Sequence, residues 1–439
     1  MSDLLQSVND AIQSTAPAVF RALSPLGQRM VMPAGIPVQA GEAKGTQYNG
    51  TIGLLTDGQN GAVPLPSVAA ALSSLGEDAL GAAVKYSPVG GFPELRERWR
   101  ARQRRNQPEY KISSLPVVTA GLSHSLSMIA DLFGGEGRLV VAPDPYWGNY
   151  NHVFGTRTGA HLASAPAFVD GRFNPLAWEQ AIASDPGLGA DEPVVAIVNL
   201  PSNPGGYSPT RAERDALRDS LVRVAENRPV VVICDDAYAG LVYELDIPSA
   251  SVFWDLVALR DNLIPIKVDG VTKELSYFGG RVGFVTFPFD PDSEVARGLT
   301  SKALGLTRST IGSPVATSQV VTLACLRRGD EVLDAETEAI RLRLERRYRT
   351  LRNALEAMET DLLTPQPFNS GSFALVEIAE GAPFDAETLR RHLIEHHSTG
   401  LISVGSRFLR IAHCSVRRLD LEELVNRLDR GAQELAAKA

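Results

Sequence analysis

The chain has 439 residues, of which 44% are hydrophobic and 21% are charged, and its formal net charge is −8. This length and apolar content predict a globular protein with one large and one smaller domain. The acidic balance offers no electrostatic footprint for nucleic acid, whose binding needs a basic face. No run of about 18 apolar residues is present to span a membrane.

The compartment is inferred from the cysteines and the N-terminus. Cys234, Cys325 and Cys414 are odd in number and far apart, which argues against a disulfide framework and favours a reducing compartment. The first 20 residues carry acidic side chains and lack a basic segment before an apolar core, so they do not resemble a secretory signal. We therefore expect a cytoplasmic protein.

The elements in chain order predict an α/β protein. Residues 36–66 are rich in Gly and polar side chains and are expected to form a loop against the smaller domain, before a helix over residues 67–75. From about residue 115 to 290, short apolar runs alternate with amphipathic segments, which is typical of a mostly parallel sheet covered by helices. The predicted strands are Val117–Thr119, Leu139–Ala142, Val194–Asn199, Val230–Cys234, Ile264–Val268 and Val282–Phe287.

The pattern becomes helical after the last of these strands. Residues 331–358 have Arg, Glu and Leu at three- and four-residue spacing, which predicts one long helix that leaves the large domain. A smaller α+β region follows. Its predicted strands are Phe373–Ile378 and Phe408–Ala412, and its predicted helices are Asp385–His397 and Leu419–Ala437.

Polar residues follow several of the predicted strands, and in open α/β sheets ligands bind at these strand ends. Gly121–Ser125 opens a helix and offers free amides and hydroxyls for a phosphate, although an ordinary Ser-capped helix explains it equally well. Trp147 belongs to an aromatic cluster on a turn, where an indole could stack on a flat ring or simply close the core edge. Asn203 is presented by a rigid turn of a common kind.

The most informative residues come next along the chain. Asp235 and Tyr238 follow one strand, Thr272 and Lys273 follow the next, and Arg281 precedes the one after that. A carboxylate for a ring nitrogen, an amine for a Schiff base and a cation for a phosphate are what pyridoxal 5'-phosphate chemistry needs. Asp236 competes with Asp235, but successive strand residues face opposite ways, so only one carboxylate is expected in the site.

These motifs together resemble the fold-type I pyridoxal phosphate aminotransferases of classes I and II, from about residue 50 to 410. Tyr86–Gly91 is similar to the family's Tyr-x-Pro-x-x-Gly segment, Asn203–Gly206 to its Asn-Pro-Thr-Gly, and Lys273–Gly283 keeps the family's lysine, glycine and arginine in register. The resemblance implies a mostly parallel seven-stranded sheet with helices on both faces and a smaller α+β domain. We place the large domain at residues 63–335 and the small one at 1–62 and 336–439.

The resemblance also implies roles for individual residues. Lys273 would form the internal aldimine with pyridoxal 5'-phosphate, Asp235 would pair with the ring nitrogen, and Thr272 would adjoin the cofactor. Tyr238 and Asn203 would hydrogen-bond to the phenolic oxygen of the cofactor, and Trp147 would stack on its ring. The phosphate would be held by Leu122, Ser123 and Arg281, and also by Tyr86 from the second subunit of a homodimer. The substrate would meet Arg410, which matches the family's carboxylate-binding arginine, and also Gly53, Asn203 and Trp147.

Two departures and one branch assignment follow from the comparison with the family pattern. Gly270 stands where a phosphate-binding serine is usual, so the affinity for phosphate could be lower or His124 could compensate, and Asn-Pro-Thr-Gly has become Asn-Pro-Gly-Gly. The segment 49–58 is closest to the aspartate and aromatic aminotransferase branch. We therefore predict dicarboxylic or aromatic donors with 2-oxoglutarate as the acceptor. In that branch an arginine from a second subunit binds the distal carboxylate of the substrate, and Arg308 is the candidate for this role.

Two other functions stay open at this point. A C-S or β-lyase would use the same fold, lysine and cofactor and would break a different bond. His392-Leu393-Ile394-Glu395-His396 fits a zinc-protease pattern with both histidines on one helical face, but the match is short and no third ligand is evident, so no metal site is predicted.

Overall fold

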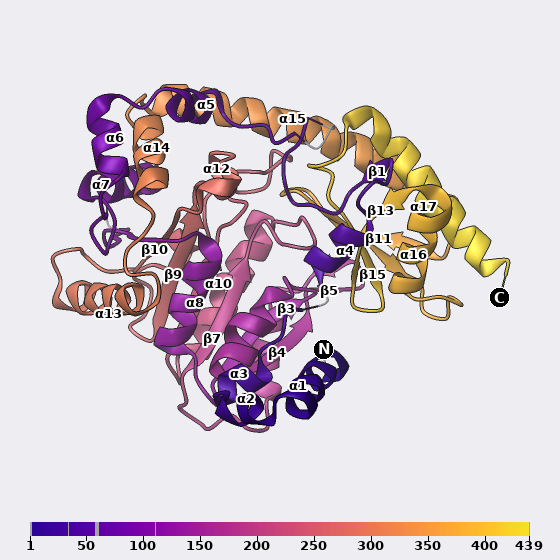
Figure 1. Cartoon of the computed structure of the whole chain (residues 1–439), viewed down its shortest axis with the longest axis horizontal. Helices are drawn as coiled ribbons and strands as arrows, with labels where there is room; N and C mark the ends of the chain where they lie inside the picture. Colours follow the sequence, from indigo (N-terminus) through magenta and orange to yellow (C-terminus); the bar gives the residue numbers. More distant parts are fainter. Residues whose placement is uncertain (1, 34, 58–60, 110, 439) are drawn as a thin grey trace.

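A computed structural model describes residues 2–33, 35–57, 61–109 and 111–438. Its centre is a seven-stranded sheet in which β10 alone is antiparallel to its neighbours (Figure 1). The spatial order is β2 (Val117–Thr119), β10 (Gly283–Thr286), β9 (Leu263–Gly270), β8 (Val230–Asp235), β7 (Val194–Asn199), β3 (Leu139–Asp144) and β4 (His161–Pro166). The structure confirms the six strands predicted for the sheet, with ends shifted by up to two residues, and adds the edge strand β4.

Helices cover both faces of this sheet because its central strands are apolar on both sides. One face packs against α8 (Leu122–Phe133), the π-helix η1 (Asn151–Thr156) and α13 (Glu294–Thr310). The other packs against α9 (Ala177–Ser184), α10 (Arg211–Val224) and α11 (Phe253–Leu256). A third cluster joins β2 and β10 to α5 (Pro66–Ser73), α7 (Pro93–Arg104) and α14 (Ala316–Leu326). Short elements complete this part, namely α6 (Glu77–Ala83), β5 (Phe168–Val169), β6 (Arg172–Phe173), α12 (Val271–Glu274) and η2 (Phe278–Gly280).

A second, smaller sheet lies at the other end of the long helix α15 (Asp330–Glu356) (Figure 1). Its order is β11 (Leu363–Pro365), β12 (Ala374–Ile378), β15 (Phe408–Ile411) and β14 (Ile402–Val404). It packs against α16 (Ala386–His397) and α17 (Leu421–Ala436), which η3 (Arg418–Asp420) precedes. Leu333 of α15 packs near the large sheet and Leu351 packs in the small-domain core, so this helix connects the two parts.

The N-terminal region contacts both parts. Its helices are α1 (Ser2–Thr15), α2 (Pro17–Ala22), α3 (Pro25–Arg29) and α4 (Ile36–Glu42). Arg29 donates to the main-chain carbonyls of Thr156 and Arg157, whereas β1 (Tyr48–Asn49) pairs with β13 (Thr399–Gly400) beside the small sheet. The segment 36–66, expected to be a loop, contacts the small domain through β1, but its first seven residues are helical and Leu65 packs with the large-domain elements, while residues 58–60 lie outside the described residues. Pro37 at the start of α4 explains the helix, since proline fits the first turn of a helix. The domain boundaries themselves stay a prediction.

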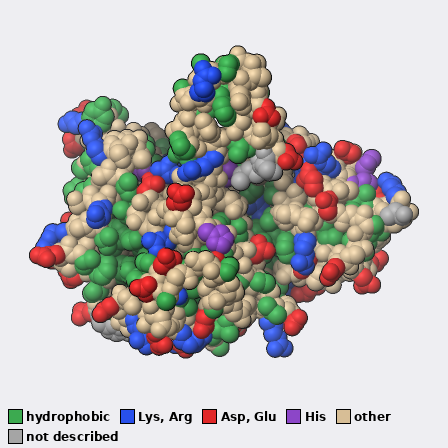
Figure 2. Space-filling view, turned by 90° about the horizontal axis from the view of Figure 1, so that it is seen from below, with side chains coloured by type: hydrophobic (Ala, Val, Ile, Leu, Met, Phe, Trp, Pro, Cys, Tyr) green, Lys and Arg blue, Asp and Glu red, His purple; other side chains and the backbone are tan. Residues whose placement is uncertain are grey.

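Most charged residues of the chain are distributed over its outer surface. Figure 2 shows acidic and basic side chains interspersed over one face of the molecule. Among the described helices, none combines the length and the apolar character needed to cross a bilayer.

Candidate active site

A cavity of about 430 Å³ lies where the ends of β7, β8 and β9 meet the N-terminus of α8 and residues of the small sheet. Most of the predicted site residues line it. They are Gly53, Leu122, Ser123, Trp147, Asn203, Asp235, Tyr238, Thr272, Lys273, Arg281 and Arg410. The structure therefore brings together residues from eight separate stretches of the sequence.

Lys273 lies in the short helix α12, which begins directly after β9 ends at Gly270. Its Nζ donates to the carbonyl of Gly53 and lies 4.9 Å from the ring centroid of Phe278 and 5.4 Å from that of Tyr238. Burial among these groups, together with a smaller contribution from the guanidinium of Arg410, lowers the pKa of the Lys273 amine to about 8. The neutral, nucleophilic form is therefore accessible near neutral pH.

The structure decides between the two neighbouring carboxylates. Asp235 enters the cavity, where its Oδ2 accepts a 2.7 Å hydrogen bond from the hydroxyl of Tyr150. Burial raises the pKa of Asp235 to about 6, while the Tyr150 hydrogen bond opposes that rise. Asp236 points to the opposite side of the sheet and forms a buried ion pair with Lys267. The alternation of strand residues is confirmed, and Asp235 is the carboxylate available to a ring nitrogen.

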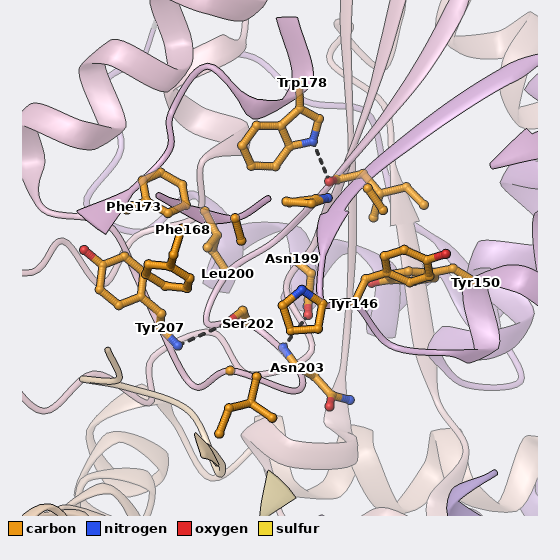
Figure 3. Close-up of a pocket in the computed structure, with 17 residues that line it drawn as sticks. Tyr146, Tyr150, Phe168, Phe173, Trp178, Asn199, Leu200, Ser202, Asn203 and Tyr207 are labelled. Atoms are coloured by element: carbon orange, nitrogen blue, oxygen red, sulfur yellow. Dashed lines mark hydrogen bonds between the residues drawn. The ribbon is translucent and has the colours of Figure 1, made fainter. Parts of the chain in front are cut away.

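A small aromatic pocket behind the cavity supports the asparagine that faces it. Figure 3 shows this pocket, of about 40 Å³, which shares Tyr150, Asn199 and Asn203 with the main cavity. Asn199 uses its two ends differently: its Oδ1 accepts from the amide of Asn203 at 2.7 Å, and its Nδ2 donates to the carbonyl of Asp235 at 2.9 Å. Asn199 thus fixes the turn that carries Asn203 relative to β8.

The opposite end of the cavity suits a phosphate. Gly121 has φ +86° at the start of α8, and a Cβ there would lie 2.6 Å from Nη2 of Arg281, so the guanidinium rests against the helix N-terminus. Free amides and a cation at this place attract anions. The hydroxyl of Thr272 is buried in the described structure without a hydrogen-bond partner, although it lines the cavity. An unsatisfied buried hydroxyl beside a cationic helix N-terminus fits a phosphate oxygen.

Steric crowding explains why position 270 holds a glycine and not the serine that is usual in the family. A Cβ at this position would lie 2.6 Å from the carbonyl oxygen of Val282 and 2.9 Å from Cα of Gly283, in the paired strand β10. A serine therefore does not fit without moving the backbone. His124 does not replace it, because His124 is absent from the cavity lining and its Nδ1 accepts a hydrogen bond from the amide of Ala120.

Arg410 comes from β15 of the small sheet and is 2% exposed. Its Nη2 donates to the carbonyl of Thr51 at 2.7 Å, its Nη1 lies 3.3 Å from Oδ1 of Asn203, and its guanidinium lies 4.3 Å from the ring centroid of Phe373. Its Nε is buried and without a partner in the described structure. Burial lowers the pKa of Arg410 to about 10, so it remains a cation at neutral pH and can bind a planar carboxylate.

Two predicted residues lie outside the cavity. Tyr86 is 97% exposed, and Arg308 is exposed near the C-terminal end of α13. Both were expected to act across a subunit interface, so a single chain leaves their roles untested.

Sequence reasoning missed several residues of the site. Tyr150 and Asn199 contact Asp235 and Asn203, while Phe278 and Phe373 flank the two cationic side chains. Tyr150 lies three residues after Trp147, in the aromatic cluster that follows the predicted strand Leu139–Ala142, and Asn199 ends a predicted strand. The other two carry no local signal, since aromatic residues of this kind are usual in cores.

The zinc-protease pattern is not assembled as a catalytic site. The side chains of Glu395 and His396 are 68% and 56% exposed, and His392 instead lies with His397 against Glu434. This arrangement lacks the glutamate of the motif, so the protease hypothesis is not supported.

Comparisons with known proteins agree with this geometry. The family described as aminotransferase class I and II matches residues 51–428. The aspartate aminotransferase of Bacillus subtilis is 25% identical over 79% of this chain and 83% of its own length. An aminotransferase structure from Anaerococcus prevotii has a TM-score of 0.79 at 20% identity and covers 92% of this chain and 98% of that one. A Pyrococcus horikoshii kynurenine aminotransferase has a TM-score of 0.77 at 19% identity, with coverage of 95% and 98%.

The two structures show the fold, and the family match extends over most of the chain. An amine with a lowered pKa, a buried carboxylate and an anion site at a helix N-terminus are the groups that pyridoxal 5'-phosphate requires of its protein. The chain belongs to the class I and II aminotransferases and is a pyridoxal phosphate-dependent transaminase of fold type I.

Proposed function

We propose that this aminotransferase acts through Lys273, Asp235 and Arg410, with dicarboxylic or aromatic amino acids as donors and 2-oxoglutarate as the acceptor. The observation that carries the proposal is that one cavity holds an amine with a pKa of about 8, a buried carboxylate and a buried guanidinium. When bound, pyridoxal 5'-phosphate supplies a carbonyl for amines and a ring that withdraws electrons from the substrate Cα.

The residues of the cavity would have separate roles in this reaction. Because the pKa of Lys273 is about 8, its Nζ would accept a proton from the substrate Cα and hold it as an ammonium before donating it again. Asp235 would keep the ring nitrogen of the cofactor protonated, and Arg410 would orient the substrate by binding its α-carboxylate. Tyr238 and Asn203 are the hydrogen-bonding groups for the phenolic oxygen, and Trp147 is the stacking side chain.

The phosphate of the cofactor would bind at the end of the cavity formed by the N-terminus of α8. Ser123, the amide of Leu122, Thr272 and Arg281 line the helix N-terminal end of the cavity. We assign to Thr272 the hydroxyl contact that serine provides elsewhere in the family, since its Oγ1 is buried and unpaired in the described structure and Gly270 has no room for a side chain.

The donor preference rests on a wider cleft outside the cavity. This cleft, of about 930 Å³, shares Ile36, Trp147, Asn203 and Arg410 with the cavity, and Arg410 is the only Lys or Arg side chain among its described lining residues. Most of the remaining lining is apolar or uncharged, which suits an aromatic side chain. A distal carboxylate would need Arg308 from a second subunit. The similarity to aspartate and kynurenine aminotransferases supports both donor classes.

Two further proposals concern the state of the protein. A homodimer would place the exposed Tyr86 of one subunit at the active site of the other. A cytoplasmic location is supported by three free, buried cysteines, which suit a reducing compartment.

The test is a panel of amino-acid donors against 2-oxoglutarate, pyruvate and oxaloacetate. We expect aspartate and aromatic donors to be fastest with 2-oxoglutarate. Glutamate is assayed with oxaloacetate, because with 2-oxoglutarate it would only regenerate the same amino acid and oxo acid. Arg308→Leu should slow aspartate and glutamate while leaving aromatic donors unchanged, and Arg297→Leu, on the exposed side of the same helix, is the matched control. Unchanged rates for aspartate and glutamate in Arg308→Leu would contradict the assignment of Arg308. Release of pyruvate and ammonia without any oxo-acid acceptor would favour the lyase.

A further inference from the structure

Helices α16 and α17 lie side by side in the small domain (Figure 1), and two buried histidines of α16 meet a glutamate near the C-terminal end of α17. The Nε2 atoms of His392 and His397 lie 2.9 and 3.0 Å from the same carboxylate oxygen, Oε2 of Glu434. All three atoms lie within 4.8 Å of one another. None of these residues lines the cavity or the cleft of the active site.

We propose that His392, His397 and Glu434 form a Zn²⁺ site that fastens α16 to α17. Imidazole nitrogen and carboxylate oxygen are ligands that Zn²⁺ takes readily, and two histidines with one glutamate form a known three-ligand set. Tetrahedral ligands about 2.1 Å from the metal lie about 3.4 Å apart. The observed separations therefore require only small side-chain rotations to admit the ion.

The surroundings hold the ligands in place. The side chains of His392 and His397 are 6% and 7% exposed, whereas the side chain of Glu434 is 39% exposed. The partly open glutamate leaves a path by which an ion can enter and a position for water as the fourth ligand. Gly431, one helical turn before Glu434, makes the approach possible, since a Cβ there would lie 2.9 Å from Leu393.

The main chain around His397 is also fixed. Its carbonyl accepts hydrogen bonds from Nη1 of Arg427 at 2.6 Å and from Oγ1 of Thr399 at 3.0 Å. The next residue, Ser398, ends α16 with φ +47°, and its hydroxyl accepts from the amide of Gln47. A site with a fixed backbone and buried ligands loses less entropy when it binds a metal than a flexible surface cluster does.

The test is a zinc titration of the holoenzyme in competition with a chromophoric chelator. We expect one Zn²⁺ per chain with a Kd of about 1 μM or tighter. Glu434→Gln preserves shape and should weaken binding at least tenfold, as should His397→Ala. Glu395→Gln is the matched control for Glu434→Gln, because that carboxylate is on α16 but its side chain is 68% exposed and outside the cluster.

Aminotransferase activity should stay unchanged in all three variants, which separates this proposal from the one for the active site. Anomalous diffraction at the zinc edge should place the ion between α16 and α17. The proposal is overturned if wild-type protein binds no zinc below 100 μM, which is about 100 times the expected Kd, or if Glu434→Gln and wild type bind it equally well.

Discussion

Replacing Gly270 by the serine that is usual in the family should harm this protein rather than improve its cofactor binding. The added Cβ would lie 2.6 Å from the carbonyl oxygen of Val282 and 2.9 Å from both Cα of Gly283 and Cδ1 of Leu122. Two of these three atoms belong to the backbone of the paired region and cannot rotate away. Overpacking of this kind costs about 1 to 3 kcal/mol.

The expected effects can be measured in two ways. At about 2 to 4 °C per kcal/mol for a domain of 150 to 250 residues, the melting temperature of Gly270→Ala or Gly270→Ser should fall by about 2 to 12 °C. The added Cβ would also displace Leu122 at the phosphate end of the cavity. We therefore expect weaker binding of pyridoxal 5'-phosphate in a titration of the apoenzyme. Melting is followed by calorimetry or fluorescence.

The control is Gly298→Ala in the exposed part of α13, where a Cβ meets nothing within 4 Å. It should leave melting unchanged or raise it slightly, because alanine favours a helix over glycine by about 0.5 to 1 kcal/mol. The steric argument would be refuted if the Gly270→Ser enzyme had the same melting temperature as the wild-type enzyme and bound the cofactor more tightly.

Three further predictions concern the active site. The pKa of Lys273 is lowered to about 8, so its neutral form dominates above that pH, and the rate at which the apoenzyme takes up pyridoxal 5'-phosphate should rise through an inflection near pH 8. Stopped-flow absorbance measures this rate, and an inflection above pH 10 contradicts the burial argument. Tyr150→Phe removes a 2.7 Å hydrogen bond to Asp235, and since bonds to charged groups contribute about 1.5 to 3 kcal/mol, kcat/KM should fall by up to about 10- to 150-fold. The pKa of Asp235 should then rise above about 6, and an unaltered acidic limb of the pH profile would argue against this role. Arg410→Lys keeps the charge and loses the bidentate geometry, so the donor KM should rise by about 10-fold or more, and an unchanged KM would place the substrate carboxylate elsewhere.

The sequence by itself predicted six of the seven strands of the large sheet and most of the polar residues that line the cavity. Strands β7 and β8 were predictable because strands buried on both faces are continuous apolar runs. Lys273, Asp235 and Arg281 were predictable because ligands gather where such strands end, and because the order of these residues resembles one family. Strand β4 was missed because it lies at the edge of the sheet, where only one of its six residues is buried.

The tertiary structure alone decided which groups meet. Asp235 rather than Asp236 faces the cavity because the chain alternates along β8 and Lys267 pairs with the other carboxylate. Tyr150 reaches Asp235 across 85 positions of sequence, a contact that no local pattern encodes. The crowding at Gly270 likewise depends on the pairing of β9 with β10. Such contacts are set by packing between distant segments, which composition, periodicity and motif spacing do not specify.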